Sequence, residues 1–377
     1  MRTITVEGAE GFTIEAPSVM AYAFNRLPFA VKNESAVYLR CTFLVQLNGV
    51  ELGAETREAY GGSVSANLQQ YVQSAFSEIS LSTTATASGR VVIPSQMMKT
   101  FAVLVVASAT LESGTISTLN YTVGQDVIFG TMGARESSSM PSKIRLYPNL
   151  PQTFDLLANE QSKLYLEELG PGGGLVYNAD LPVSAIGTAS GYRLVNVNMG
   201  GLGAGYKLLN VVVRPTMVVN GAEVVAPAMW RTLAEIDDST CGVYIRWLDR
   251  HGRWQYFLFT EAENSYDVKT LQEWEIATTN DPADYVDGLN DAISKMRSFQ
   301  RSNTRKLTAP LVDEGLRELL LSLMMAIVVD VYDGRDAEGT HLWHRVLVKP
   351  GKFSEAYQPL QNFSVEIEEP DVYSQIS

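Results

Sequence analysis

The sequence predicts a mainly β protein with two β-sandwich-like or barrel-like domains, each buttressed by one α-helix. Between residues 90 and 129, short apolar runs alternate with glycine-bearing turns about every 10 to 13 residues, which is the spacing of an all-β domain. Apolar residues recur at the helical period of 3.6 in 63–79 and in 311–325. The strongest local signal is an antiparallel hairpin at 241–259.

The length of the chain favours two domains. With 377 residues, it exceeds one ordinary hydrophobic core. We place the domains at 1–135 and 144–377, joined by a glycine- and serine-rich linker at 136–143.

Charge and hydropathy disfavour several classes of function. Charged residues make up 19% of the chain, below the usual share of about 25%, so the surface is weakly charged or partly buried in an assembly. The net charge of −13 disfavours direct nucleic-acid recognition, because the phosphate backbone requires a basic surface. We expect no secretory signal peptide and no membrane span.

The first domain is expected to begin with strands and one helix. The run Val37–Leu47 leads into Asn48-Gly49, a dipeptide that favours the positive φ of a tight reversal. The apolar stripe of 63–79 predicts an amphipathic helix capped by Ser63. Further strands are predicted at 90–93, 101–107, 117–123 and 126–129.

The second domain is expected to continue with strands at 144–147, 153–157 and 162–166. Two glycine-rich runs follow, Gly170–Gly174 and Gly200–Gly205. A phosphate-binding loop would have to open a helix, but Tyr206–Val213 reads as a strand. We therefore interpret the glycines as turns, or as loops that become ordered against a neighbour.

The predicted hairpin, CGVYIRWLDRHGRWQYFLF at 241–259, has two apolar, aromatic-rich strands around a short polar turn. Period 2 divides its first strand into two largely apolar faces: Val243, Ile245 and Trp247 on one, and Tyr244, Arg246 and Leu248 on the other. Neither face suits water, so the hairpin is expected inside a sandwich or barrel, or with one face in a subunit contact. We expect the turn on the surface, where Asp249, Arg250 and Arg253 could bind a carboxylate or phosphate.

Residues 260–308 are polar and poorly patterned, and we expect a long partner-binding loop there. Its basic stretch, Lys295–Lys306, is interpreted as a solvated or partner-facing segment, because no aromatic stacking series accompanies it. A helix over 311–325 follows, with Asp313 as its N-cap and Arg317 facing solvent. The final strands are predicted at 327–332, 342–348 and 363–367.

The sequence contains no recognisable catalytic motif, and we predict no enzyme, cofactor or metal site. His341 and His344 lie three apart on a predicted strand and therefore point to opposite faces, unlike a two-histidine metal site. Cys41 and Cys241 are both expected to be buried free thiols. The adjacent carboxylates Asp237-Asp238 and Glu368-Glu369 are interpreted as solvated edges.

The side chains expected to contact partners are aromatic or basic residues of the hairpin and of the basic stretch. They are Tyr244, Arg246, Trp247, Arg250, His251, Arg253, Trp254, Arg297, Arg301 and Arg305.

Three segments carry a resemblance to a known group of proteins: SKIRLYPNLPQTFDLL at 142–157, the hairpin at 241–259, and the ending Trp343–Val348 with FSVEIEEP at 363–370. They resemble structural tail-tip or baseplate proteins, of the distal-tail type, from tailed phages and prophages of gut bacteria. The resemblance implies a β-rich adaptor made in the host bacterial cytoplasm. It would assemble into a ring, such as a trimer or hexamer, and join the tail tube to other tail proteins in the virion. No functional residues are carried over.

Two alternatives from other classes stay open. A carbohydrate- or receptor-binding adhesin could stack sugars on Trp230, Trp254 or Trp274. A glycoside hydrolase could use carboxylates such as Asp237 or Asp238. Fold analogy alone does not decide between these functions.

Overall fold

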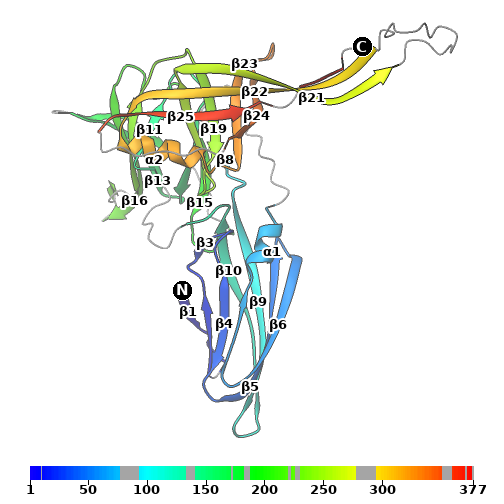
Figure 1. Ribbon diagram of the computed structural model, residues 1–377. Helices are drawn as coiled ribbons and strands as arrows, with labels where there is room; N and C mark the ends of the chain where they lie inside the picture. Colours follow the sequence, from blue (N-terminus) through cyan, green and yellow to red (C-terminus); the bar gives the residue numbers. More distant parts are fainter. Residues whose placement is uncertain are drawn as a thin grey trace, which may run out of the picture. The chain divides into compact units, whose positions relative to one another are not determined.

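The structure, a computed structural model, confirms the predicted mainly β fold, with 61% of residues in strands and 6% in helices (Figure 1). It describes residues 1–9, 11–76, 93–132, 141–170, 173–181, 187–219, 222–225, 230–276, 294–349, 359–369 and 372–375.

The chain divides into two compact units. The first comprises Met1–Thr240, Leu248–Tyr256 and Arg335–His341; the second comprises Cys241–Trp247, Phe257–Gly334 and Leu342–Ser377. The chain first passes from one unit to the other after Thr240. This boundary lies about a hundred residues beyond the linker predicted at 136–143. Residues 136–140 of that linker lie outside the described part of the chain, so the linker stays a prediction.

The first unit begins with a β-sandwich. One sheet has the order β1-β2-β4-β7, with β1 Arg2–Thr5, β2 Phe12–Ala16, β4 Pro28–Asn33 and β7 Ser63–Asn67. The other has the order β3-β10-β9-β5-β6, with β3 Met20–Tyr22, β10 Ile116–Ile128, β9 Met98–Leu111, β5 Ala36–Leu47 and β6 Val50–Tyr60. Alternate side chains of both sheets, such as Ile14, Val31, Phe43 and Val103, fill one core.

Two predicted features of this sandwich were wrong. The helix predicted over 63–79 is reduced to α1, Gln69–Ser74, and the predicted cap Ser63 lies in strand β7. Val64 and Ala66 are buried on one face of that strand, so their spacing fits period 2 as well as period 3.6, and pairing with β4 selects the strand. Residues 77–79 lie outside the described part of the chain.

The break expected between the predicted strands 117–123 and 126–129 is also absent. Gly124 stays in the ladder opposite Ala102, and β10 is one continuous strand where two had been expected. The reversal at Asn48-Gly49 is confirmed, with φ values of 52° and 80°. Residues 90–92 of the predicted strand 90–93 are not among the described residues.

Two further sheets of the first unit enclose a second core. One has the order β11-β18-β16-β13-β14, with β11 Lys143–Leu146, β18 Trp230–Ile236, β16 Leu208–Val219, β13 Ser162–Glu168 and β14 Leu175–Asp180, and β17 Ala222–Val225 pairs with β16. The other has the order β12-β15-β8, with β12 Thr153–Ala158, β15 Arg193–Asn198 and β8 Ile93–Pro94. The predicted strands near 144, 153 and 162 are confirmed. The run after Gly205 enters strand β16, as expected, and not a helix.

The second unit is built on one large sheet of order β20-β19-β23-β24-β25-β22-β21. Its strands are β20 Trp254–Phe259, β19 Val243–Leu248, β23 Val328–Arg335, β24 His341–Val348, β25 Gln361–Glu368, β22 Ser294–Val312 and β21 Glu261–Ile276, and β26 Val372–Gln375 pairs with β22. The predicted hairpin is therefore confirmed as β19 and β20. Both of its faces are almost entirely buried, as its apolar pattern predicted.

Helix α2, Glu314–Leu323, covers the core face of this sheet with the predicted stripe of Leu316, Leu319, Leu320 and Leu323. The Asp313 carboxylate accepts the backbone N–H of Leu316 at 3.0 Å, which confirms the predicted N-cap. Arg317 was expected to face solvent but is only 7% exposed. The buried face of α2 therefore includes Arg317 in addition to the four leucines.

The long loop expected at 260–308 is instead a two-stranded ribbon. β21 and β22 pair from Glu261↔Thr308 to Ile276↔Ser294, and residues 277–293 lie outside the described part of the chain. Strand β25 pairs with β22 only as far as Thr304, so β21 and β22 run on together beyond it, yellow and orange in Figure 1. The ribbon was missed because its polar residues lack the apolar alternation of a half-buried strand.

Candidate interaction surfaces

The turn of the β19–β20 hairpin is buried, which corrects the expectation of a surface turn. Asp249 and Arg253 are 7% and 3% exposed. Asp249 Oδ1 accepts the backbone N–H groups of His251 and Arg253 at 2.9 and 3.0 Å. Its Oδ2 accepts the side-chain amide of Gln255 at 2.8 Å. These three hydrogen bonds make the Asp249 carboxylate part of the turn, and desolvation raises its pKa.

Asp155 on β12 holds the same turn from outside the hairpin. Its Oδ2 accepts the Trp254 N–H at 3.0 Å, and its Oδ1 accepts the Asn196 side-chain amide at 3.2 Å. Its carbonyl oxygen accepts Arg253 Nη1 at 3.1 Å. Burial raises the pKa of Asp155 to about 6 and lowers the pKa of Arg253. Arg253 and Trp254 are therefore interior residues of this polar cluster and not partner contacts.

The other hairpin residues divide between interior and surface. Trp247 is fully buried and donates its indole N–H to Ser322 Oγ at 2.8 Å, so it too is a core residue. His251 is half-buried, with Nδ1 2.9 Å from the Thr131 carbonyl oxygen, and burial lowers its pKa. Arg250 is exposed, and its carbonyl accepts the Thr131 N–H at 2.6 Å.

Five side chains on one face of the second unit's sheet form a cluster that we call the aromatic–arginine face. Tyr244 and Arg246 are its buried members, at 3% and 5% exposure, Tyr332 and Trp343 are half-buried, and Arg345 is exposed. The Arg246 guanidinium lies 4.2 Å from the centroid of the Trp343 ring. The Tyr332 and Trp343 ring centroids are 5.0 Å apart, and Tyr244 meets Tyr332 edge-on at 6.1 Å. The predicted candidates Tyr244 and Arg246 thus belong to a cluster larger than the hairpin.

One buried carboxylate organises this face. Asp330 is 3% exposed and accepts hydrogen bonds from Arg246 Nε at 3.0 Å and from Arg345 Nε at 2.5 Å. Two guanidinium groups donate to this one carboxylate, and the Arg345 side chain is 48% exposed. Tryptophan, tyrosine and arginine are the residues that dominate binding energy in protein interfaces. The sequence pattern places Trp343 and Arg345 on one face of a strand, but it does not encode which strands lie beside them.

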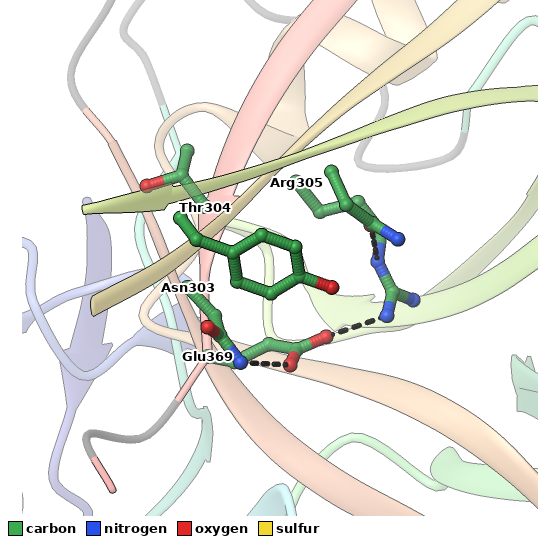
Figure 2. A pocket seen from close by; sticks show the side chains of 6 residues that line it. Asn303, Thr304, Arg305 and Glu369 are labelled. Carbon is green, nitrogen blue, oxygen red and sulfur yellow. Dashed lines mark hydrogen bonds and ion pairs between the residues drawn. The ribbon is translucent and has the colours of Figure 1, made fainter. Parts of the chain in front are cut away.

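A second candidate lies where the ribbon joins the sheet (Figure 2). The Arg305 guanidinium lies 2.7 Å from Glu369 Oε1 and donates from Nε to Asn264 Oδ1 at 2.9 Å. Asn303 Nδ2 is 3.5 Å from the other Glu369 oxygen, and the Glu369 N–H donates to the Asn303 carbonyl at 3.0 Å. These groups line a shallow hollow with Tyr266, whose side chain is exposed. Glu369, expected as a solvated edge, is instead the ion partner of Arg305.

The rest of the basic stretch lies along β22, on which Arg297 and Arg301 are placed by their register alone. Arg297 is opposite Glu273, and Lys295 is opposite Glu275, whereas Arg301 is opposite Val268. Acidic residues of β21 therefore stand across from two of the cations. This register further disfavours a nucleic-acid surface on the ribbon.

Within the ranges that the structure describes, no three side chains of metal-binding type gather in one place. His344 Nδ1 lies 2.7 Å from the Asp333 carboxylate. Cys41 is buried, and burial raises its pKa to about 12, but Cys241 is exposed, which corrects the expectation of two buried thiols. Asp237 lies 3.7 Å from the Arg145 guanidinium.

Comparison with known proteins does not assign the chain. No family model matches it, and no curated protein matches it. Within the described ranges, neither helix has the length and apolar character needed to cross a bilayer.

Proposed function

We propose that the chain is a structural subunit of a phage or phage-like tail. In this proposal it is an adaptor at the tail tip that forms a ring of identical copies in the virion and joins the tail tube to neighbouring tail proteins. The resemblance at 142–157, 241–259 and the chain's ending supports it, together with the mainly β architecture.

The observation that carries the proposal is the β21–β22 ribbon. Its strands have 16 and 19 residues, so the longer strand reaches about 60 Å at about 3.3 Å per residue. Strand β26 pairs with residues 298–301 of β22, and β25 pairs with it from Thr304 onward. The four outermost pairs of the ribbon, from Glu273↔Arg297 to Ile276↔Ser294, extend past both of these strands. A two-stranded ribbon is marginal in water by itself. We therefore infer that this outer end is stabilised by packing against neighbouring subunits.

The unpaired edge of β21 supports the same role. Among the described strands, β21 ends the sheet and has β22 as its only neighbour. A long edge presents unpaired N–H and C=O groups that another chain can extend. Charged residues along this strand, among them Glu261, Glu263 and Lys269, would limit indiscriminate pairing and favour one register.

The test is the mass of the purified protein by light scattering, with electron microscopy of the same sample. We expect a closed ring for the native chain. In a shortened variant, an Asn-Gly turn replaces 267–302, so that the pairs from Glu261↔Thr308 to Tyr266↔Asn303 remain. This variant should keep its circular dichroism and lose the ring.

The matched control is Tyr60→Ser, which changes a 92% exposed aromatic residue on the other compact unit and should leave the ring intact. A ring that survives in the shortened variant would refute the assembly role of the ribbon. Binding of a monomer to a glycan array would favour the adhesin instead.

A further inference from the structure

Leu311 combines two features that are unfavourable for a leucine. Its φ is 51°, in the left-handed region. The other non-glycine residue with positive φ in the described ranges is Asn48, in a hairpin turn that favours it. Side chains other than those of glycine, asparagine and aspartate rarely adopt this conformation. Leu311 is also 65% exposed, so its side chain adds little to the core.

The local fold requires this backbone conformation but does not require a leucine. The register between β22 and β25 shifts between Ala309 and Val312, which puts Pro310 and Leu311 in a bulge. The backbone N–H of Leu311 donates to Asn362 Oδ1 at 3.1 Å, a bond that any residue except proline could make. Glycine or asparagine would satisfy the bulge at lower cost. The fold therefore gains nothing from a leucine at this strained and exposed position, which points to a role in binding.

The surroundings of Leu311 indicate what it would bind. Leu360 is 47% exposed and precedes Gln361, which pairs with Val312. Glu314, in the first turn of α2, and Glu261, opposite Thr308 on β21, are exposed carboxylates. We call Leu311, Leu360, Glu261 and Glu314 the Leu311 knob. It is an apolar projection with an acidic rim.

The same unit carries a surface of opposite character. On the aromatic–arginine face, Arg345 is the exposed cation, and Leu347 extends the face along β24 as a 69% exposed apolar residue. An apolar projection with an acidic rim and a surface that exposes an arginine beside a leucine are complementary in both charge and hydrophobicity.

We infer that the Leu311 knob of one copy docks on the aromatic–arginine face of a second copy. The inference rests on the proposed self-assembly and specifies one of its contacts. Because the knob and the face are different surfaces, the contact is head-to-tail, and its repetition produces a ring when the rotation closes.

The experiment compares Leu311→Gly and Leu347→Ser by sedimentation velocity over a concentration series. Thermal unfolding of each variant and of the native chain is measured at a concentration where all are dissociated, because assembly itself raises the unfolding temperature. We expect Leu311→Gly to raise the dissociation constant of the ring at least tenfold while its unfolding temperature is unchanged or higher. Leu347→Ser should weaken assembly similarly. If the two side chains meet across copies, the double variant should lose less than the product of the single losses. Met325→Ser, which alters a 57% exposed residue elsewhere in the unit, is the control and should assemble normally.

Each other outcome overturns the inference. A lower unfolding temperature in Leu311→Gly would show that the leucine serves the fold. Normal assembly of this variant would refute the proposed contact and leave the ring proposal intact. The same holds if the losses of assembly free energy in the double variant are fully additive. A native chain that stays monomeric at every concentration would overturn the ring proposal as well.

Discussion

Acidification should stabilise the first unit, because Asp155 is ionised at neutral pH in a site that disfavours charge. The folded pKa of about 6 compares with an unperturbed value of 3.8, and desolvation is the main cause. A group with a raised folded pKa contributes stability that is fully present below its unfolded pKa and is lost as pH rises through the folded pKa. The shift corresponds to about 3 kcal/mol between pH 4 and pH 7.

The substitution Asp155→Asn tests this reasoning. Asparagine can still accept the Trp254 N–H, and the Asn196 amide can rotate to accept the new N–H, so the turn keeps its hydrogen bonds. Asp249 and His251 titrate nearby in both proteins, so the difference between the two unfolding curves reports on Asp155 together with its electrostatic interaction with Asp249.

The assay is urea unfolding, followed by tryptophan fluorescence, at several pH values between 4 and 7. Relative to Asp155→Asn, the native chain should gain about 3 kcal/mol of unfolding free energy as the pH falls. Asp180→Asn, which alters an exposed carboxylate of the same unit, should keep the native pH dependence. Equal slopes for the native chain and Asp155→Asn would show that the buried carboxylate does not govern this dependence.

Three further substitutions test the packing. Gly252→Ala should destabilise the first unit by more than about 3 kcal/mol, because φ is 73° and a Cβ would lie 1.8 Å from the Phe129 carbonyl oxygen; thermal unfolding measures the loss. Asp313→Ala should cost about 1 kcal/mol, since the Leu316 N–H loses its cap; Asp313→Ser should restore most of it. Leu320→Ala should cost about 2 to 5 kcal/mol in urea unfolding, because Leu320 is fully buried beneath the large sheet, whereas Ile327→Ala, at 71% exposure, should change little.

Sequence pattern predicted an element correctly where its strands or helix have apolar faces and where capping or turn residues mark its ends. Helix α2 has a leucine stripe and the Asp313 cap, and the hairpin at 241–259 has two apolar strands around a polar turn. It failed for the ribbon, whose strands are defined by pairing with each other and not by burial. It also failed at 63–67, where five residues fit both periods and pairing with a distant strand decided the outcome.

Candidate site residues were harder to predict, because burial of a charge depends on partners far along the chain. Arg253 and Asp249 look like surface turn residues until Asp155, nearly a hundred positions earlier, is placed beside the turn. Similarly, Arg246 belongs to the aromatic–arginine face only because Asp330 and Trp343 come from two other strands. Neither neighbour can be read from local periodicity.

Asp155 and Leu311 both break a local rule, and the difference between them is informative. The cost of burying the Asp155 carboxylate is offset in part within the chain by the Trp254 N–H, the Asn196 amide and nearby Arg253. The left-handed, exposed leucine has no such compensation in its surroundings, since its one backbone hydrogen bond does not need the side chain. When contacts within the chain offset the unfavourable free energy of such a residue, at least in part, the residue is structural. When no contact within the chain offsets it, we infer that the residue is retained for contact with another molecule. This contrast predicts opposite results for the two sites: changes at Asp155 should alter unfolding and leave assembly intact, and changes at Leu311 should do the reverse.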